Sequence, residues 1–373
     1  MHSAEHTSGR IPALDGVRGL AIGLVLCWHF IVSPLRGGLQ NHVCLSRIID
    51  FGRFSWSGVD LFFVLSGFLI GGILLDASQS PAYFSTFYAR RAYRIIPPYA
   101  ALILATVALI PHFGHLGWPT YANEFLYYVL FLQNFRMAGT GSFGPLGLGM
   151  TWSLAVEEQF YLTLPLIVRN VSRRILVRLL LGAVVAAPLL RIAAMQFLKM
   201  SWIAAYVLLP CRADALCLGV LIAVAMRDPL AWAKIVANRK YVYLGFALTA
   251  SAGVWLMASN VEPFAMQLFG LEYSLLALLY SFLLMSTLLS PWLSSLFSFT
   301  PFRLLGSIAY GLYLYQSLVG FVVERTWAYF KPAGPAVNLQ TSVLSFVLSL
   351  GLATISWKYF EKPLVKRGHR YQY

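Results

Sequence analysis

Charged side chains are scarce in this sequence, because only 11% of its 373 residues are Asp, Glu, Lys or Arg. In a soluble domain, about a quarter of the residues are charged. Hydrophobic residues make up 59% of the chain, the mean hydropathy is +0.70, and no long polar stretch separates the apolar runs. These values exclude a soluble domain with a single membrane anchor. They predict an all-α integral membrane protein that forms one domain over residues 1–373, with no appended soluble domain.

Acidic residues are particularly few. The chain has 14 Asp and Glu against 28 Lys and Arg, which gives a net charge of +14. In a soluble protein such an excess would indicate a nucleic-acid partner. In a membrane protein the cations gather in the cytoplasmic loops, so no nucleic-acid partner is expected.

Cysteines and targeting signals are also sparse. The four cysteines, Cys27, Cys44, Cys211 and Cys217, lack the spacing of a metal site, so no metal is expected. The N-terminal sequence, MHSAEHTSGR, shows no cleavable signal, and the first apolar segment is expected to direct membrane insertion. No internal repeat is visible, which gives no support to the inverted-repeat plan of many transporters.

Apolar runs of the length that crosses a bilayer recur along the whole chain. About ten transmembrane helices are expected, over residues 13–33, 57–76, 95–112, 151–169, 175–194, 207–226, 241–259, 270–290, 303–323 and 341–361. A shorter apolar piece at 121–135 is expected to form an interfacial or re-entrant helix.

The basic residues indicate how these helices are oriented. With a cytoplasmic N-terminus, 18 Lys and Arg residues lie in inside loops and tails and 8 in outside loops, while Arg18 and Arg212 lie within or at the edge of spans. This bias matches the positive-inside rule. Because the expected number of spans is even, both termini are predicted to be cytoplasmic.

The first span, Leu14–Val32, carries two ionisable residues in the run LDGVRGLAIGLVLCWHFIV. Arg18 and His29 are eleven positions apart, which is about three helical turns, so they share a face and lie roughly 16 Å apart along the axis. Arginine inside a membrane is costly and is kept mainly where it functions. The span therefore offers a cation near the cytoplasm and a proton-transfer group near the outer leaflet, along one stripe. This arrangement suits a long ligand with an anionic end.

Two further arginines precede the third span in the stretch FYARRAYRIIPPY. Arg91 and Arg94 are three residues apart and share a helix face. One interpretation is ordinary positive-inside charge. The other is a phosphate-binding pair, because guanidinium groups match the geometry of phosphate oxygens.

Adjacent carboxylates lie about two turns into the fourth span, in TWSLAVEEQFYLTLP. Glu157 and Glu158 point about 100° apart, so at most one aims directly at a given site. Either they pair structurally with Arg212 or another buried cation, or Glu157 lies level with His29. In the second case the carboxylate would bond one imidazole nitrogen and raise the basicity of the other.

Other polar residues in the spans allow two interpretations each. Asp60, at the outer start of the second span, caps that helix or faces the site. Arg212 and Asp214, in LPCRADALCLG, pair with each other or balance charge near a substrate. Tyr310 and Tyr313, in LLGSIAYGLYLYQSLVG, pack between helices or contribute to chemistry.

Several of these stretches, in this order between residues 11 and 363, resemble the membrane acyltransferase family 3 of bacteria. The resemblance rests on LDGVRGLAIGLVLCWHF, SGVDLFFVLSGFLI, FYARRAYRIIPPY, TWSLAVEEQFYL, RADALCLG, LGSIAYGLYLYQ and WKYFEKP. One departure lies in LYLYQSL, where many members have a histidine in place of Tyr315 or Gln316. Some members also carry a soluble esterase-like domain, which is not expected here.

The resemblance implies an enzyme that transfers an acyl group, usually acetyl from acetyl-CoA, to a glycan hydroxyl. It carries function to Arg18, His29, Arg91, Arg94 and Glu157, and the family pattern favours Glu157 over its neighbour Glu158. The CoA phosphates are then expected on Arg91 and Arg94, with Arg18 further along the arm. His29 is expected to act as general base, oriented by Glu157. Tyr310, Tyr313 or a backbone amide would stabilise the oxyanion.

The resemblance implies the inner membrane of a bacterial cell. The acceptor is left open, since lipopolysaccharide, exopolysaccharide, peptidoglycan, a lipid-linked glycan or a small glycosylated metabolite would all fit. The oligomeric state is left open as well. The main alternative is a transporter or channel, in which Arg18, His29 and Glu157 form a proton or anion pathway. A purely structural membrane protein is a third class, which the number of buried ionisable groups at matched depths disfavours.

Overall fold

The computed structural model describes residues 11–35, 52–113, 124–145, 147–258, 270–330 and 335–373. Within these ranges the regular structure is entirely helical, which confirms the predicted all-α class. The α-helices are α1 (Pro12–Cys27), α2 (Ser33–Leu35), α4 (Gly58–Asp76), α5 (Tyr83–Phe113), α7 (Phe125–Val129), α8 (Gln133–Thr140), α9 (Trp152–Asn170), α10 (Arg173–Ile192), α11 (Trp202–Val207), α12 (Leu209–Met226), α13 (Pro229–Ala237), α14 (Arg239–Ala258), α15 (Leu271–Leu289), α16 (Pro291–Phe297), α17 (Thr300–Ser307), α18 (Ala309–Ala328), α19 (Pro335–Ser356) and α20 (Lys362–Gly368). Short π-helical segments are η1 (Trp28–Val32), η4 (Ala193–Phe197) and η6 (Trp357–Glu361), and 3₁₀ turns are η2 (Ser55–Ser57) and η3 (Gly149–Thr151).

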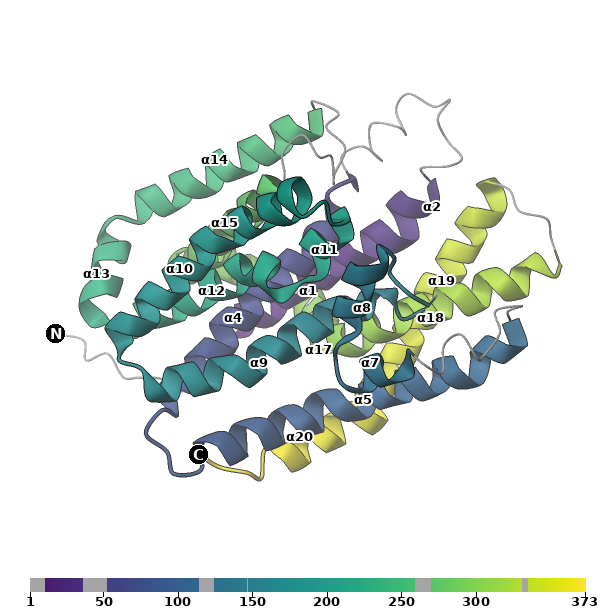
Figure 1. Ribbon diagram of the computed structural model, residues 1–373, viewed down its shortest axis with the longest axis horizontal. Coiled ribbons are helices and arrows are strands. Elements are labelled where there is room, and N and C mark those ends of the chain that lie inside the picture. The colour runs from purple at the N-terminus through teal and green to yellow at the C-terminus, as the bar shows by residue number, and fades with distance from the viewer. Residues whose placement is uncertain (1–10, 36–51, 114–123, 146, 259–269, 331–334) are drawn as a thin grey trace.

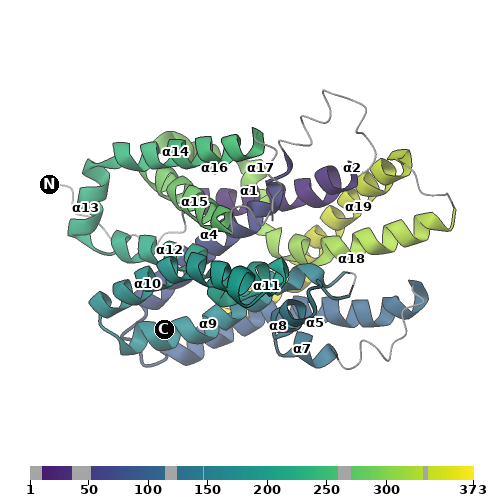
Figure 2. The ribbon, with the colours of Figure 1, turned by 45° about the horizontal axis from the view of Figure 1, so that its top comes forward.

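The long helices lie side by side along the long axis of the molecule (Figure 1). Helices α1, α4 and α12 occupy the middle of the bundle, while α14 lies at one edge and α5 with α20 at the other (Figures 1 and 2). The middle helices pack on one another and on α10, α15 and α17. Residues far apart in the chain therefore meet in the interior.

Seven helices of the described residues are long and apolar enough to cross a membrane. An eighth is added if α17 and α18, which meet at an angle of 66°, count as one bent span. Each of the ten expected ranges contains a helix, but the number ten and the cytoplasmic placement of both termini stay predictions.

The third span begins earlier than expected. Helix α5 starts at Tyr83, not at residue 95, and it continues through the two prolines that were expected to open it. Its first turns are held by Tyr83 and Phe87, which are one turn apart and both buried, and the Tyr83 hydroxyl donates to the carbonyl oxygen of Pro165 in α9 at 3.2 Å. As a result, Arg91 and Arg94 lie inside the helix and not in a loop before it.

The apolar piece expected at 121–135 forms two short helices, α7 and α8, over its described part; residues 121–123 lie outside the described ranges. Buried amides fasten α8 to its neighbours: Gln133 Nε2 donates to the carbonyl oxygen of Thr151 at 2.9 Å, and Gln159 of α9 donates to Asn134 Oδ1 at 2.9 Å. The roles of Gln133, Asn134 and Gln159 were not predicted, because a hydropathy pattern does not show which amides will bond each other.

Helices α4 and α12 approach closely because glycines face the partner backbone. A Cβ atom on Gly67 would overlap the carbonyl oxygen of Leu216, and one on Gly219 would overlap that of Val64. Small residues at such crossings let membrane helices pack backbone to backbone. The close approach brings Asp60 of α4 next to Arg212 of α12.

We predict that Gly67→Ala lowers the unfolding free energy by about 1–3 kcal/mol, the range for overpacking a well-packed core. Gly182→Ala in α10 is the matched control, because nothing lies within 4 Å of its added Cβ. It is expected to be neutral or to stabilise the helix by about 0.5–1 kcal/mol. Thermal unfolding of both purified proteins in detergent measures the difference. Equal melting temperatures would contradict the close α4–α12 packing.

Candidate functional site

Three arginines from two helices form one cluster, which we call the arginine cluster: Arg18 of α1 with Arg91 and Arg94 of α5. Arg94 interacts electrostatically with both of the others. All three are partly buried, and Arg18 also pairs with Asp15 one turn earlier, at 3.0 Å. Like charges repel, so such a cluster persists only with anionic partners nearby. The structure thus brings together the three arginines that the sequence singled out in separate segments.

Glu157 of α9 is the carboxylate that faces this cluster. It lies within electrostatic reach of Arg91 and Arg94, beside the hydroxyls of Ser66 and Tyr161, which are hydrogen-bonded to each other. The Arg91 guanidinium lies over the Tyr161 ring, 5.2 Å from its centroid, in a cation–π arrangement. Neither Ser66 nor Tyr161 was singled out from the sequence, because a hydroxyl within an apolar run has no spacing signal.

Glu158 lies beside the same cluster. It interacts with Arg91 and with Glu157, and its buried Oε1 has no hydrogen-bond partner among the described residues. Of the two structural interpretations, pairing with Arg212 is wrong, since the cations near both glutamates belong to α5.

His29 lies at the other end of α1, within the π-helical turn η1. π-helical turns are rare in proteins, and those that occur are frequently found at functional sites. Its side chain is exposed and makes no hydrogen bond to any described residue. The expected bond between Glu157 and His29 is therefore not formed. Glu157 instead interacts with Arg91 and Arg94 of α5.

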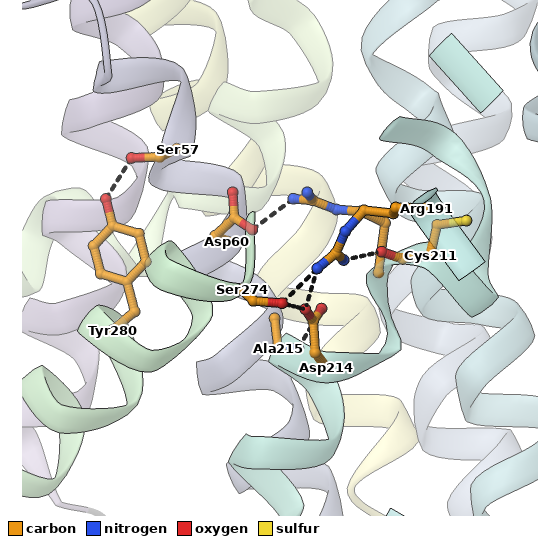
Figure 3. Close-up of polar contacts among 9 residues, drawn as sticks. Ser57, Asp60, Arg191, Cys211, Asp214, Ala215, Ser274 and Tyr280 are labelled. Atoms are coloured by element: carbon orange, nitrogen blue, oxygen red, sulfur yellow. Dashed lines mark hydrogen bonds and ion pairs between the residues drawn. The ribbon is translucent and has the colours of Figure 1, made fainter. Parts of the chain in front are cut away.

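A second group of charges, the ion-pair network, is fully buried near the start of α4 and α12 (Figure 3). Arg212 donates to Asp60 Oδ1 at 2.5 Å, and Arg191 of α10 donates to Asp214 Oδ2 at 2.9 Å. Ser274 of α15 donates to the same Asp214 oxygen at 2.8 Å. One of the interpretations of Arg212 and Asp214, a mutual pair, is therefore wrong: each of the two pairs with a residue of another helix. Asp60 likewise pairs across helices and not with its own helix start.

Aromatic rings surround Arg212 on several sides. Its guanidinium carbon lies 4.4 Å from the ring centroid of Tyr273 and 5.3 Å from that of Tyr206, and the rings of Phe63 and Trp152 are also close. Such contacts stabilise a desolvated cation. Arg212 is 1% exposed and Arg191 is 0% exposed. Because both guanidinium groups are inaccessible to solvent, we interpret the ion-pair network as structural.

Arg191 was not singled out from the sequence, although it falls inside the expected span 175–194. The structure places it in α10, fully buried and bonded to the carbonyl oxygen of Cys211 as well as to Asp214. Its position inside an apolar run was the signal that could have identified it.

Tyr310 and Tyr313 of α18 bond backbone carbonyl groups of neighbouring elements through their hydroxyls. Tyr310 donates to the carbonyl oxygen of Ile95 and Tyr313 to that of Met150, each at 2.9 Å. Because both hydroxyl protons already have backbone acceptors, the geometry favours the packing interpretation for these residues. They fasten α18 to α5 and to the turn before α9.

Residues that could bind a metal ion do not gather anywhere in the described ranges, where no three His, Cys, Asp or Glu side chains form a ligand group. The cationic cluster instead suits an anionic ligand, since guanidinium groups bind phosphate or carboxylate through paired N–H donors.

We predict that Asp60→Asn lowers the unfolding free energy by about 3–5 kcal/mol, because it leaves Arg212 buried without a counter-charge. The control is Arg136→Gln, which removes the exposed pair of Arg136 and Glu124 and is expected to cost at most about 1 kcal/mol. Unfolding in detergent measures both. The network would not be structural if the two variants unfolded alike.

Comparison with known proteins assigns the chain to a family. The family model for an acyltransferase domain matches residues 11–358. The chain is 27% identical to a peptidoglycan O-acetyltransferase of Listeria monocytogenes over 382 residues, which covers 96% of this chain and 56% of that protein. It is also 27% identical to a putative peptidoglycan O-acetyltransferase of Bacillus subtilis, with 99% of this chain and 57% of that protein covered.

A third relative is an O-acetyltransferase of Staphylococcus aureus, 23% identical over 96% of this chain and 58% of that protein. The chain thus spans a little over half the length of these curated relatives. No solved structure matches it. Because the family match extends over almost all of the chain, the chain belongs to this acyltransferase family, the membrane acyltransferase family 3 that its motifs resemble.

Proposed function

We propose that this protein is a membrane O-acetyltransferase that moves an acetyl group from cytoplasmic acetyl-CoA, or a related acyl-CoA, to a hydroxyl of a cell-envelope glycan in a bacterial inner membrane. The observation that carries the proposal is the arrangement along α1: a partly open arginine cluster at Arg18 and an exposed His29 about three turns away. One long molecule with an anionic end and a reactive end fits both.

The anionic end is the nucleotide part of CoA. Arg91 and Arg94 share a face of α5 and would bind its phosphate oxygens, with Arg18 further along the arm. Glu157 then has a different role from the one expected. It holds Arg91 and Arg94 in place and balances their charge while the donor site is empty. Incoming phosphates would compete with this carboxylate for the same guanidinium groups.

The reactive end is the thioester. His29 would accept the proton of the acceptor hydroxyl, and the hydroxyl oxygen would form a bond to the acyl carbonyl carbon. Collapse of the tetrahedral intermediate breaks the carbon–sulfur bond, and the leaving CoA thiolate takes the proton back from the His29 imidazolium, which restores the base. The exposed side chain of His29, free of hydrogen bonds to described residues, supports this role because a base must be open to its substrate.

The printed names of the relatives support peptidoglycan as the acceptor class. A glycan at the outer face matches the predicted direction of α1, with Arg18 toward the cytoplasm and His29 toward the outer leaflet. Lipopolysaccharide and exopolysaccharide have no such support here.

We predict that His29→Ala abolishes transfer of radiolabelled acetyl from acetyl-CoA to peptidoglycan fragments, because general base catalysis contributes roughly 10²–10⁴-fold. Ile31→Ala is the matched control, since Ile31 lies two residues on in the same π-helical turn and is 50% exposed. It is expected to retain activity. Full transfer by His29→Ala, with wild-type melting behaviour, would rule out His29 as the base.

We also predict that Arg91→Gln and Arg94→Gln each weaken acetyl-CoA binding by about tenfold or more, the loss expected for a hydrogen bond to a charged group. Arg174→Gln removes the same charge from an exposed position at the start of α10. Calorimetric titration with acetyl-CoA compares the three. If Arg174→Gln weakens acetyl-CoA binding as much, the loss of affinity comes from the reduced positive charge of the whole protein, which would contradict a direct phosphate contact at Arg91 and Arg94.

A further inference from the structure

Arg90 is the first arginine of the stretch FYARRAYRIIPPY, and the mechanism above gives it no role. It lies one residue before Arg91 and about one helical turn before Arg94, whose face of α5 it shares. Its side chain is partly exposed, and its Nε and Nη2 atoms donate to the backbone oxygen of Tyr371, at 2.9 and 2.6 Å. Nη1 makes no hydrogen bond to any described residue, so its two N–H groups are available to a ligand.

The segment that follows α20, residues 369–373, lies against the start of α5, and we call it the tail (Figure 1). Helix α20 packs along the first turns of α5, where Gly368 lies so close to Tyr93 that an added Cβ atom would approach Tyr93 Cβ to 3.0 Å. The Thr86 hydroxyl donates to the carbonyl oxygen of Gln372 at 2.7 Å. Together with the two bonds from Arg90, these contacts hold the tail beside the arginines of α5.

The tail places two tyrosine rings next to Arg90. The guanidinium carbon of Arg90 lies 4.9 Å from the ring centroid of Tyr373, and the ring centroids of Tyr371 and Tyr93 are 6.1 Å apart. Tyr371 is 45% exposed and Tyr373 is 36% exposed. A ligand can therefore reach both rings and the neighbouring guanidinium from outside the bundle.

Positive charge dominates this surface. Lys366, Arg367 and Arg370 are exposed in or next to the tail, and no Asp or Glu occurs in residues 77–113, which include α5, or in residues 362–373, which comprise α20 and the tail. Guanidinium groups bind phosphate through paired N–H donors, and nucleobases stack on aromatic rings. The combination suits a phosphorylated nucleotide better than inorganic phosphate or a lipid headgroup, because neither of these has a flat ring to stack.

We propose that Arg90 and the tail form a subsite for the nucleotide end of acyl-CoA, in which Arg90 binds the 3′-phosphate and the adenine base stacks on the Tyr371 ring. The inference rests on the proposed function, in which the diphosphate of the same molecule binds Arg91 and Arg94. The 3′-phosphate and the diphosphate leave one ribose ring, so they need cations on one face of the protein. Arg90 and Arg94, about 5.4 Å apart along the axis of α5, provide them.

The order of groups along CoA also matches the order of these residues. Adenine and the 3′-phosphate form one end of the donor, the diphosphate follows, and the arm ends in the thioester. On the protein, the tail and Arg90 lie at the beginning of α5, Arg91 and Arg94 follow within one turn, and α1 leads from Arg18 to His29. The donor can thus run in one direction, from the outer surface of α5 into the bundle.

The test compares acetyl-CoA with 3′-dephospho-acetyl-CoA, which lacks only the 3′-phosphate, by calorimetric titration of the full chain in detergent. Wild type is expected to bind acetyl-CoA about tenfold more tightly, the value of a hydrogen bond to a charged group. Arg90→Gln should weaken acetyl-CoA binding about tenfold and change dephospho-acetyl-CoA binding by less than about twofold. Arg94→Gln, in contrast, should weaken the binding of both ligands, since both carry the diphosphate.

This comparison separates a phosphate contact from a structural role of Arg90. If Arg90 only held the tail in place, Arg90→Gln would weaken the binding of both ligands alike and preserve the preference for the 3′-phosphate. Arg174→Gln, which removes a charge from an exposed position on α10, is expected to bind both ligands as wild type.

A second arm tests the base. Tyr371→Leu keeps an apolar side chain and the backbone oxygen that Arg90 bonds, but it removes the ring. It should weaken the binding of both ligands by about fivefold or more, because both contain adenine. Tyr371→Phe keeps the ring and is expected to bind as wild type. Tyr329→Leu is the matched control, since Tyr329 follows α18 and is 77% exposed.

The outcomes distinguish the subsite from the proposed function. Equal affinity of wild type for the two ligands, an unchanged preference in Arg90→Gln, or wild-type affinity in Tyr371→Leu overturns the subsite and leaves the proposed function standing. A surface that bound only anionic lipid headgroups would give such a result. Wild-type protein that binds neither ligand overturns the proposed function itself, and the subsite with it.

Discussion

Asp60 of α4 and Arg212 of α12 face each other at 2.5 Å inside an apolar bundle, where water cannot solvate either charge. Removing one partner would leave a buried charge uncompensated, so the pair constrains how the two helices cross. Arg191 and Asp214 impose the same constraint on α10 and α12, and Ser274 adds α15. The middle of the bundle is thus assembled around paired charges as well as around close glycine contacts.

The charges of the arginine cluster also lie near groups of opposite charge, but they are less deeply buried than those of the ion-pair network. Arg18, Arg91 and Arg94 come from two helices, and the carboxylates that interact with them come from α1 and α9. Unlike Arg191 and Arg212, all three remain partly exposed. Under the proposed function, this partial exposure is what would let an anionic ligand compete with a carboxylate for the guanidinium groups. The two groups of charges therefore differ in exposure: the ion-pair network is fully buried, whereas the arginine cluster is only partly buried.

Much of this organisation could be predicted from the sequence. The apolar runs indicated the helices, and Arg18, His29, Arg91, Arg94 and Glu157 stood out because ionisable residues are rare in such runs. What could not be predicted was which charges meet. The pairs Asp60–Arg212 and Arg191–Asp214 join helices distant in the chain. The early start of α5 at Tyr83 depends on buried tertiary contacts of Tyr83 and Phe87, which no local pattern shows. The interaction of Glu157 with Arg91 and Arg94, in place of the expected bond to His29, is likewise a tertiary contact.

The central claim is that the arginine cluster binds the phosphates of an acyl-CoA whose thioester reaches toward His29. An experimental structure of the full chain with a non-hydrolysable acetyl-CoA analogue tests it most directly. The account predicts phosphate oxygens within hydrogen-bonding distance of Arg91 and Arg94, with the pantetheine arm running along α1 toward His29. An analogue bound at another face of the bundle, with Arg91 and Arg94 still facing only Glu157, would contradict it.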